Sequence, residues 1–102
     1  MRLWRANLYR LNISSKINEI AELAADLTPV GDIAVLLDIE EDLLRMELGM
    51  PDSPVRQAYL KARAKTAHML RKQELELARV GSPLAVQLTG AYLRDMITSE
   101  DL

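Results

Sequence analysis

The sequence predicts an all-α fold, a small helical bundle organised around one long helix. Neither Gly nor Pro interrupts residues 55–80, and the apolar residues of this stretch keep a helical period. A Ser-Pro or Thr-Pro pair, which favours a helix start, precedes three segments, and no stretch shows the alternation of a strand. The 102 residues are 49% apolar but only 4% aromatic, which suits one aliphatic core. We therefore expect residues 1–102 to form a single helical domain.

A basic helix is predicted at the start of the chain, over residues 1–13. Its apolar residues recur at helical spacing: Leu3, Trp4, Leu8 and Leu11. The helix is expected to end near Asn12. A membrane-surface role is one interpretation, but the shortness of the segment favours a helix laid on the core or on a neighbouring subunit.

Residues 14–48 form a predicted acidic region of short helices. Ser14 or Ser15 is expected to cap the first of them, which ends at about Asp26. In the next, the Thr28 hydroxyl can accept an unpaired N–H, and Pro29 suits the first helical position because it has no N–H to satisfy.

That helix is expected to run to Leu37, and the break Asp38-Ile39 separates it from a helix over residues 40–48. Acidic residues in the first turn of the latter suit the positive end of the helix dipole. The segment 49–54 is rich in turn residues, with Ser53 as the expected cap of the long helix.

The long helix, residues 54–80, is predicted to carry three different faces. A core face contains Val55, Tyr59, Ala62, Thr66, Leu70, Gln73, Leu77 and Val80. A basic face contains Lys61, Lys65, His68, Lys72 and Arg79. A second apolar line contains Leu60, Ala64, Ala67, Leu75 and Ala78. Gly81 is the expected left-handed cap, and Ser82-Pro83 starts a C-terminal helix over residues 82–97.

Charge is segregated along the chain, although the net charge is only −2. Residues 1–16 carry +4, residues 17–52 carry −9, residues 53–81 carry +5 and residues 82–102 carry −2. Solvated helix faces produce such a pattern, and so do complementary surfaces within an assembly or a localised anion-binding face.

The residues that most chemistry requires are missing. The absence of Cys excludes disulfides, thiolate metal sites and Cys nucleophiles, and it fits a reducing compartment. His68, the only histidine, has no carboxylate one helical turn away and is interpreted as a surface residue. The acids near Asp38 lack the spacing and Gly of a calcium loop. We therefore expect a protein that is not an enzyme and that binds neither a metal nor a cofactor.

The location is expected to be the cytoplasm, or the host cytoplasm if the protein is viral. The apolar runs are too short to span a membrane, and the start of the chain lacks the apolar block and cleavage site of a signal peptide.

The segment Asp32–Arg45, Asp-Ile-Ala-Val-Leu-Leu-Asp-Ile-Glu-Glu-Asp-Leu-Leu-Arg, resembles a helix-turn-helix. Ala34 would let two helices approach closely, and large aliphatic residues around it would fill the angle between them. Residues 59–64 and 71–85 resemble the segments that follow the helix-turn-helix in small phage-encoded DNA-binding proteins of this kind, particularly small terminase subunits. In these a long helix with an Arg-Lys-Gln stretch runs into Leu-Ala, a Gly and a final helix. The resemblance covers residues 27–96.

This resemblance implies an all-helical protein that binds viral DNA and assembles into a ring through its long helices. It also implies a separate packaging ATPase as partner, which the small subunit regulates without hydrolysing ATP itself. The chain departs from the family pattern in one respect. Glu40, Glu41 and Asp42 stand where the family offers polar or basic residues to DNA, and Arg45 is the only base on the recognition helix.

A carboxylate about 4 Å from a phosphate is repelled by roughly 1 kcal/mol even in water. We therefore expect weakly specific DNA binding on the long helix instead. The predicted DNA-binding residues are Lys61, Lys65, Lys72 and Arg79, with Arg2, Arg5, Arg10 and Arg45. The predicted contact between copies uses the second apolar line, Leu60, Ala64, Ala67, Leu75 and Ala78. The competing interpretation is a helical adaptor protein without nucleic-acid binding, whose charged surfaces serve only assembly.

Overall fold

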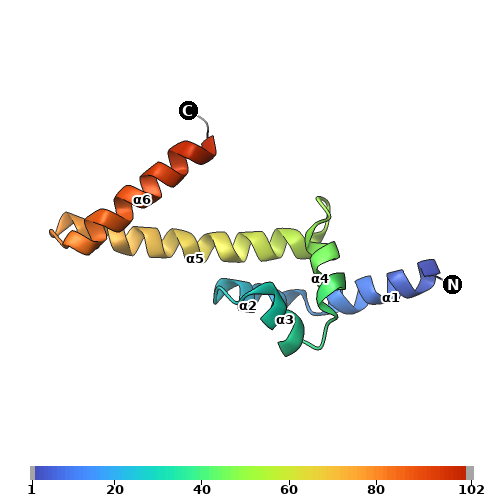
Figure 1. The fold of residues 1–102 in the computed structure, drawn as a ribbon. Helices are drawn as coiled ribbons and strands as arrows, with labels where there is room; N and C mark the ends of the chain where they lie inside the picture. The colour runs from blue at the N-terminus through green and yellow to red at the C-terminus, as the bar shows by residue number, and fades with distance from the viewer. Residues whose placement is uncertain (1, 101–102) are drawn as a thin grey trace. The chain divides into compact units, whose positions relative to one another are not determined.

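The structure, a computed structural model, describes the backbone from Arg2 to Glu100 and the side chains from Leu8 to Glu100. Its helices are α1 (Arg2–Ser15), α2 (Ile17–Ala25), α3 (Val30–Leu36), α4 (Glu41–Leu48), α5 (Pro54–Arg79) and α6 (Pro83–Glu100) (Figure 1). The described residues contain no strand, so the predicted all-α fold class is confirmed. The contacts divide the chain into two compact units, residues 1–66 and 67–102, and α5 contributes to both.

The first unit contains the hydrophobic core. It is built almost entirely from aliphatic side chains of α1 to α5, together with one aromatic ring. The buried members are Ile13, Ile20, Ala24, Ile33, Ala34, Ile39, Leu44, Val55 and Tyr59. Full burial of one such Ile, Leu or Val side chain stabilises a fold by about 1.5–3 kcal/mol, so α1 and α5 are both held firmly to this unit.

Two predicted helix starts are wrong. Ser14 and Ser15 lie within α1 and do not cap α2. The Ser15 hydroxyl instead donates to the Asn12 carbonyl, and Lys16 occupies the cap position without a side-chain cap. Thr28 does not cap α3 either, since Pro29 is the N-cap residue and no side chain caps this helix. The Thr28 backbone N–H instead closes the preceding helix by donating to the Leu23 carbonyl at 3.0 Å.

α3 consequently starts at Val30, with Pro29 as its N-cap residue. α4 likewise starts one residue later than predicted, with Glu40 as its N-cap. The predicted cap of α5 is confirmed, since the Ser53 hydroxyl accepts the Arg56 backbone N–H at 3.3 Å.

Side chains from other elements satisfy the C-terminal carbonyls of the short helices. The Lys16 ammonium donates to the Leu37 carbonyl at the end of α3. From α5, Arg56 donates to the Leu48 carbonyl of α4 at 3.0 Å, and the Thr66 hydroxyl donates to the Ala25 carbonyl of α2. Helix-end carbonyls lack partners within their own helix, so these bonds fix where each short helix ends.

The predicted core face of the long helix is correct in the first unit only. Val55 and Tyr59 are buried and Ala62 packs against the core. Beyond Thr66 the same face is exposed: Leu70 is 44%, Leu77 49% and Val80 81% accessible. The apolar period predicted a single buried stripe, but the core that would cover it ends with the first unit.

The second unit consists of the end of α5, a turn and α6. Gly81 has φ +92°, and its N–H and that of Ser82 close α5 by donating to the Ala78 and Leu77 carbonyls, as predicted. Ser82 caps α6 by accepting the Ala85 N–H at 3.4 Å. α6 continues to Glu100, beyond its predicted end at residue 97. The hydroxyls of Thr98 and Ser99 donate to carbonyls four residues back, which keeps them compatible with the helix.

Candidate nucleic-acid interface

α3 and α4 form the packed helix pair that the helix-turn-helix resemblance predicts. Ala34 is 2% accessible, and the buried Ile33 and Leu44 fill the angle between the two helices. The connecting turn places Asp38 at φ +55°, and the Ile39 N–H donates to the Ala34 carbonyl at 2.9 Å. A non-Gly residue therefore occupies the left-handed position of this turn, where Asp is among the side chains that tolerate it best.

The first turn of α4 presents carboxylates to solvent. Glu40, Glu41 and Asp42 are all exposed. Arg45, the base of this helix, has its Nε atom 3.3 Å from the Glu41 carboxylate, and both side chains are about half exposed. α4 thus keeps the acidic character that the sequence indicates, and the positive charge of Arg45 is already paired.

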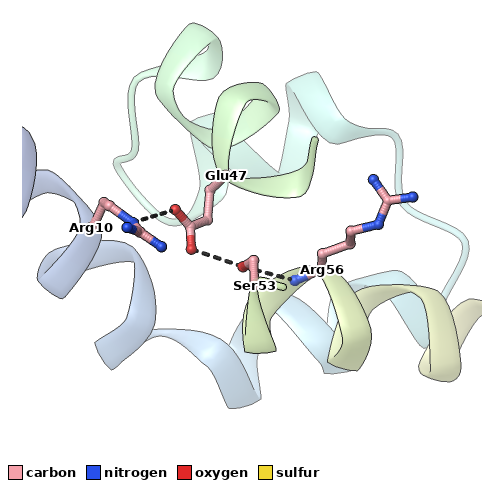
Figure 2. A network of polar contacts seen from close by, with 4 residues as sticks. All are labelled: Arg10, Glu47, Ser53 and Arg56. Atoms are coloured by element: carbon pink, nitrogen blue, oxygen red, sulfur yellow. Dashed lines mark hydrogen bonds and ion pairs between the residues drawn. The ribbon is translucent and has the colours of Figure 1, made fainter. Parts of the chain in front are cut away.

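A network of polar contacts joins α1, α4 and the start of α5 (Figure 2). The Glu47 carboxylate is 2% accessible and accepts from Arg10 Nε at 3.1 Å and from Ser53 Oγ at 2.8 Å. Ser53 in turn accepts the Arg56 backbone N–H. The network satisfies a buried charge and connects three helices of the first unit.

This network changes the interpretation of Arg10, which the sequence assigns to DNA binding. Its guanidinium is half exposed, but the Nε–H is committed to Glu47, so Arg10 has a structural role that sequence reasoning missed. The available signal was Glu47 itself, which follows Leu44 by three residues and Leu43 by four and thus shares the buried face of α4. The side chains of Arg2 and Arg5, also predicted to bind DNA, lie outside the described residues.

The remaining predicted bases all lie on α5 and form what we call the basic stripe: Lys61, Lys65, Lys72 and Arg79. All of these side chains are exposed. In the described part of the chain, none has a carboxylate within ion-pairing distance. Their spacing places them within about 40° of one another around the helix axis. The stripe is therefore a row of accessible, unneutralised cations on one helix.

Two further bases of α5 were missed by the sequence analysis. Arg63 lies over the ring of Tyr59, with 5.3 Å from its guanidinium carbon to the ring centre, and Arg71 lies over Tyr92 at 5.4 Å. The Tyr59–Arg63 pair is separated by one helical turn, so its spacing alone could have indicated the contact.

The predicted contact line between copies has a mixed environment. Leu60 packs against the core of the first unit, which leaves less of it for another subunit. Ala64 is exposed, Ala67 and Ala78 are half-buried, and Leu75 is 46% accessible.

Comparison of the chain with protein-family models, with curated proteins and with solved structures finds no match. Among the described residues, no helix is long and apolar enough to cross a membrane, and no group of His, Asp and Glu side chains could hold a metal ion.

Proposed function

We propose that the protein is a non-catalytic, oligomeric DNA-binding protein that contacts the phosphate backbone through the basic stripe of α5. The observation that carries the proposal is the row of exposed Lys and Arg side chains on α5, which lack carboxylate partners in the described residues. Cations of this kind neutralise phosphates and release counterions, which supplies most of the affinity of non-specific DNA binding.

Phosphate contacts carry no sequence information, so binding through the stripe is weakly specific. The acidic first turn of α4 opposes insertion of this helix into a DNA groove. Arg45, the only base of α4, is paired with Glu41 and is therefore less available to a phosphate. Association of several copies would multiply the weak affinity of one stripe by avidity.

In the role that the small terminase resemblance implies, the oligomer would hold viral DNA in the host cytoplasm for a separate packaging ATPase. This role rests on the motifs of residues 27–96 alone.

The test is a titration of short DNA duplexes of several sequences against salt, followed by fluorescence anisotropy. With roughly four phosphates neutralised per subunit, the slope of log affinity against log salt is expected near −3.6. The double variant Lys65→Ala with Lys72→Ala should weaken binding to every sequence alike and flatten the slope by about 2 per subunit. Arg45→Ala with Arg94→Ala removes the same charge from other exposed positions and should change the slope little.

If Arg45→Ala alone abolishes binding or relaxes a sequence preference, the helix-turn-helix reads DNA and the placement on α5 is wrong. If the intact protein binds no duplex even at low salt, DNA binding itself is wrong. The second candidate function, a helical adaptor protein, would then be favoured by the exposed carboxylates at the start of α4.

A further inference from the structure

The second unit, residues 67–102, lacks a core of its own. In its described part only Ala85 is buried. Its exposed large apolar side chains are Met69, Leu70, Leu75, Leu77, Val80, Leu84, Val86, Leu93, Met96 and Ile97. Helical pieces below about 40 residues usually need disulfides, a metal or association to be stable. The sequence has no Cys, and the described residues offer no metal-binding cluster, so association is the remaining means of stabilisation.

An apolar groove lies between the two helices of this unit. α6 diverges from the end of α5 beyond the Gly81 turn (Figure 1). The groove has a volume of about 490 Å³, and its apolar lining is Leu75 of α5 with Tyr92, Leu93 and Met96 of α6. The α6 residues follow three- and four-residue spacing, which is the pattern of a helix-packing seam. The groove therefore fits a helix better than a compact small ligand.

The groove carries opposite charges on its two sides. Arg71 lines it from α5, whereas Asp95 and Glu100 line it from α6. In the described chain Arg71 has no carboxylate within ion-pairing distance; its guanidinium lies over the Tyr92 ring instead. A partner that brought a carboxylate beside Arg71 and a cation beside Asp95 would pair the charges on both sides of the groove.

We propose that the occupant is α6 of a second copy, in a two-fold dimer in which each α6 lies in the groove of the other. An α6 seated there carries its own Asp95 and Glu100 towards Arg71 of α5, and two-fold symmetry repeats the same contact on the other side. The four helices then bury the Leu75, Leu93 and Met96 side chains that one copy leaves exposed. This inference rests on the oligomeric part of the proposed function and names its interface, which lies mainly on α6 and shares Leu75 with the predicted Leu60–Ala78 line.

The first test measures the mass of the full chain in solution by light scattering after size exclusion, at about 50 µM. A dimer is expected. Leu93→Glu with Met96→Glu places charges in the seam and should weaken association by more than about a hundredfold, which gives a monomer. Leu84→Glu is the matched control, because Leu84 is also exposed but lies on the opposite side of α6 from Leu93.

A charge exchange tests the pairing even if the seam variant loses helicity in circular dichroism. Arg71→Glu alone, and Asp95→Lys with Glu100→Lys alone, should each weaken the dimer by repulsion. An equimolar mixture of the two should restore a dimer, because every cross-contact is then between opposite charges.

A monomeric wild-type chain at this concentration overturns the proposal. So does a seam variant that stays dimeric like the control, a mixture that stays monomeric, or an Ala64→Glu with Ala67→Glu variant that alone dissociates the protein. The DNA titration separates the two proposals. A monomer that still binds DNA with a steep salt slope contradicts the interface and the oligomeric part of the proposed function, but not the DNA contact on α5. A dimer that binds no DNA contradicts only the DNA-binding function.

Discussion

Glu47 is a buried carboxylate whose two partners come from outside its own helix. Arg10 reaches it from α1, and Ser53 reaches it from the cap of α5. The sequence indicates that position 47 falls on the apolar side of α4, but it cannot indicate a partner 37 residues away. Long-range pairing of this kind depends on the tertiary packing of α1, which local periodicity does not specify.

Removing one partner of the Arg10–Glu47 pair should lower the free energy of unfolding more than replacing both partners by apolar residues. Arg10→Met leaves the Glu47 charge buried with only the Ser53 hydroxyl, and we expect a loss of about 2–3 kcal/mol of unfolding free energy, since half of Arg10 is exposed. Arg10→Met with Glu47→Leu removes the charge as well and should recover more than half of that loss. Urea unfolding at neutral pH measures both. A single variant within about 0.5 kcal/mol of the wild type would show that the pair contributes little to stability.

α4 is the element on which the helix-turn-helix resemblance and the charge pattern disagree. Its packing against α3 was predictable, because Ala34 and the aliphatic residues around it are local in sequence. The turn was predictable in place but not in conformation, since Asp38 occupies a left-handed position that usually favours Gly. The outer face remains acidic in the structure, so the electrostatic argument against groove insertion holds at the level of the element.

Neutralising this face tests whether α4 approaches DNA. Glu40→Gln with Asp42→Asn should raise DNA affinity by less than about threefold if the duplex lies along α5, because charges more than about 8 Å away are screened at physiological salt. Glu19→Gln with Glu22→Gln, which removes two exposed acids from α2, should have a similar small effect. A rise of more than tenfold confined to the α4 variant, or a new sequence preference, would place α4 in the groove.

At the scale of the whole molecule, the two units differ in what stabilises them. The first has a core to which all of its helices contribute, and the sequence predicted the parts of this core around Ala34 and along the start of α5, where Val55 and Tyr59 are buried. The second was not predictable in the same way. α5 and α6 carry apolar residues on several sides, so periodicity could not decide which side is covered, and the predicted core face beyond Thr66 is exposed. In the dimer that we propose, the missing information is the surface of the second copy.

Hydrogen exchange at different protein concentrations should separate the units. Amides of α2 to α4 are protected by the core of one chain, so their exchange should not depend on concentration. Amides of α6 should exchange mainly in the dissociated monomer. The helix pair of the second unit has one buried side chain among its described residues, so its stability in a single chain is marginal. In a mostly dimeric sample the monomer fraction varies as the inverse square root of concentration, so tenfold dilution should speed α6 exchange about threefold.

The Leu93→Glu with Met96→Glu variant should show fast α6 exchange at every concentration. If α6 of the wild type is equally protected at all concentrations, its stability comes from within one chain and association is not required to hold it.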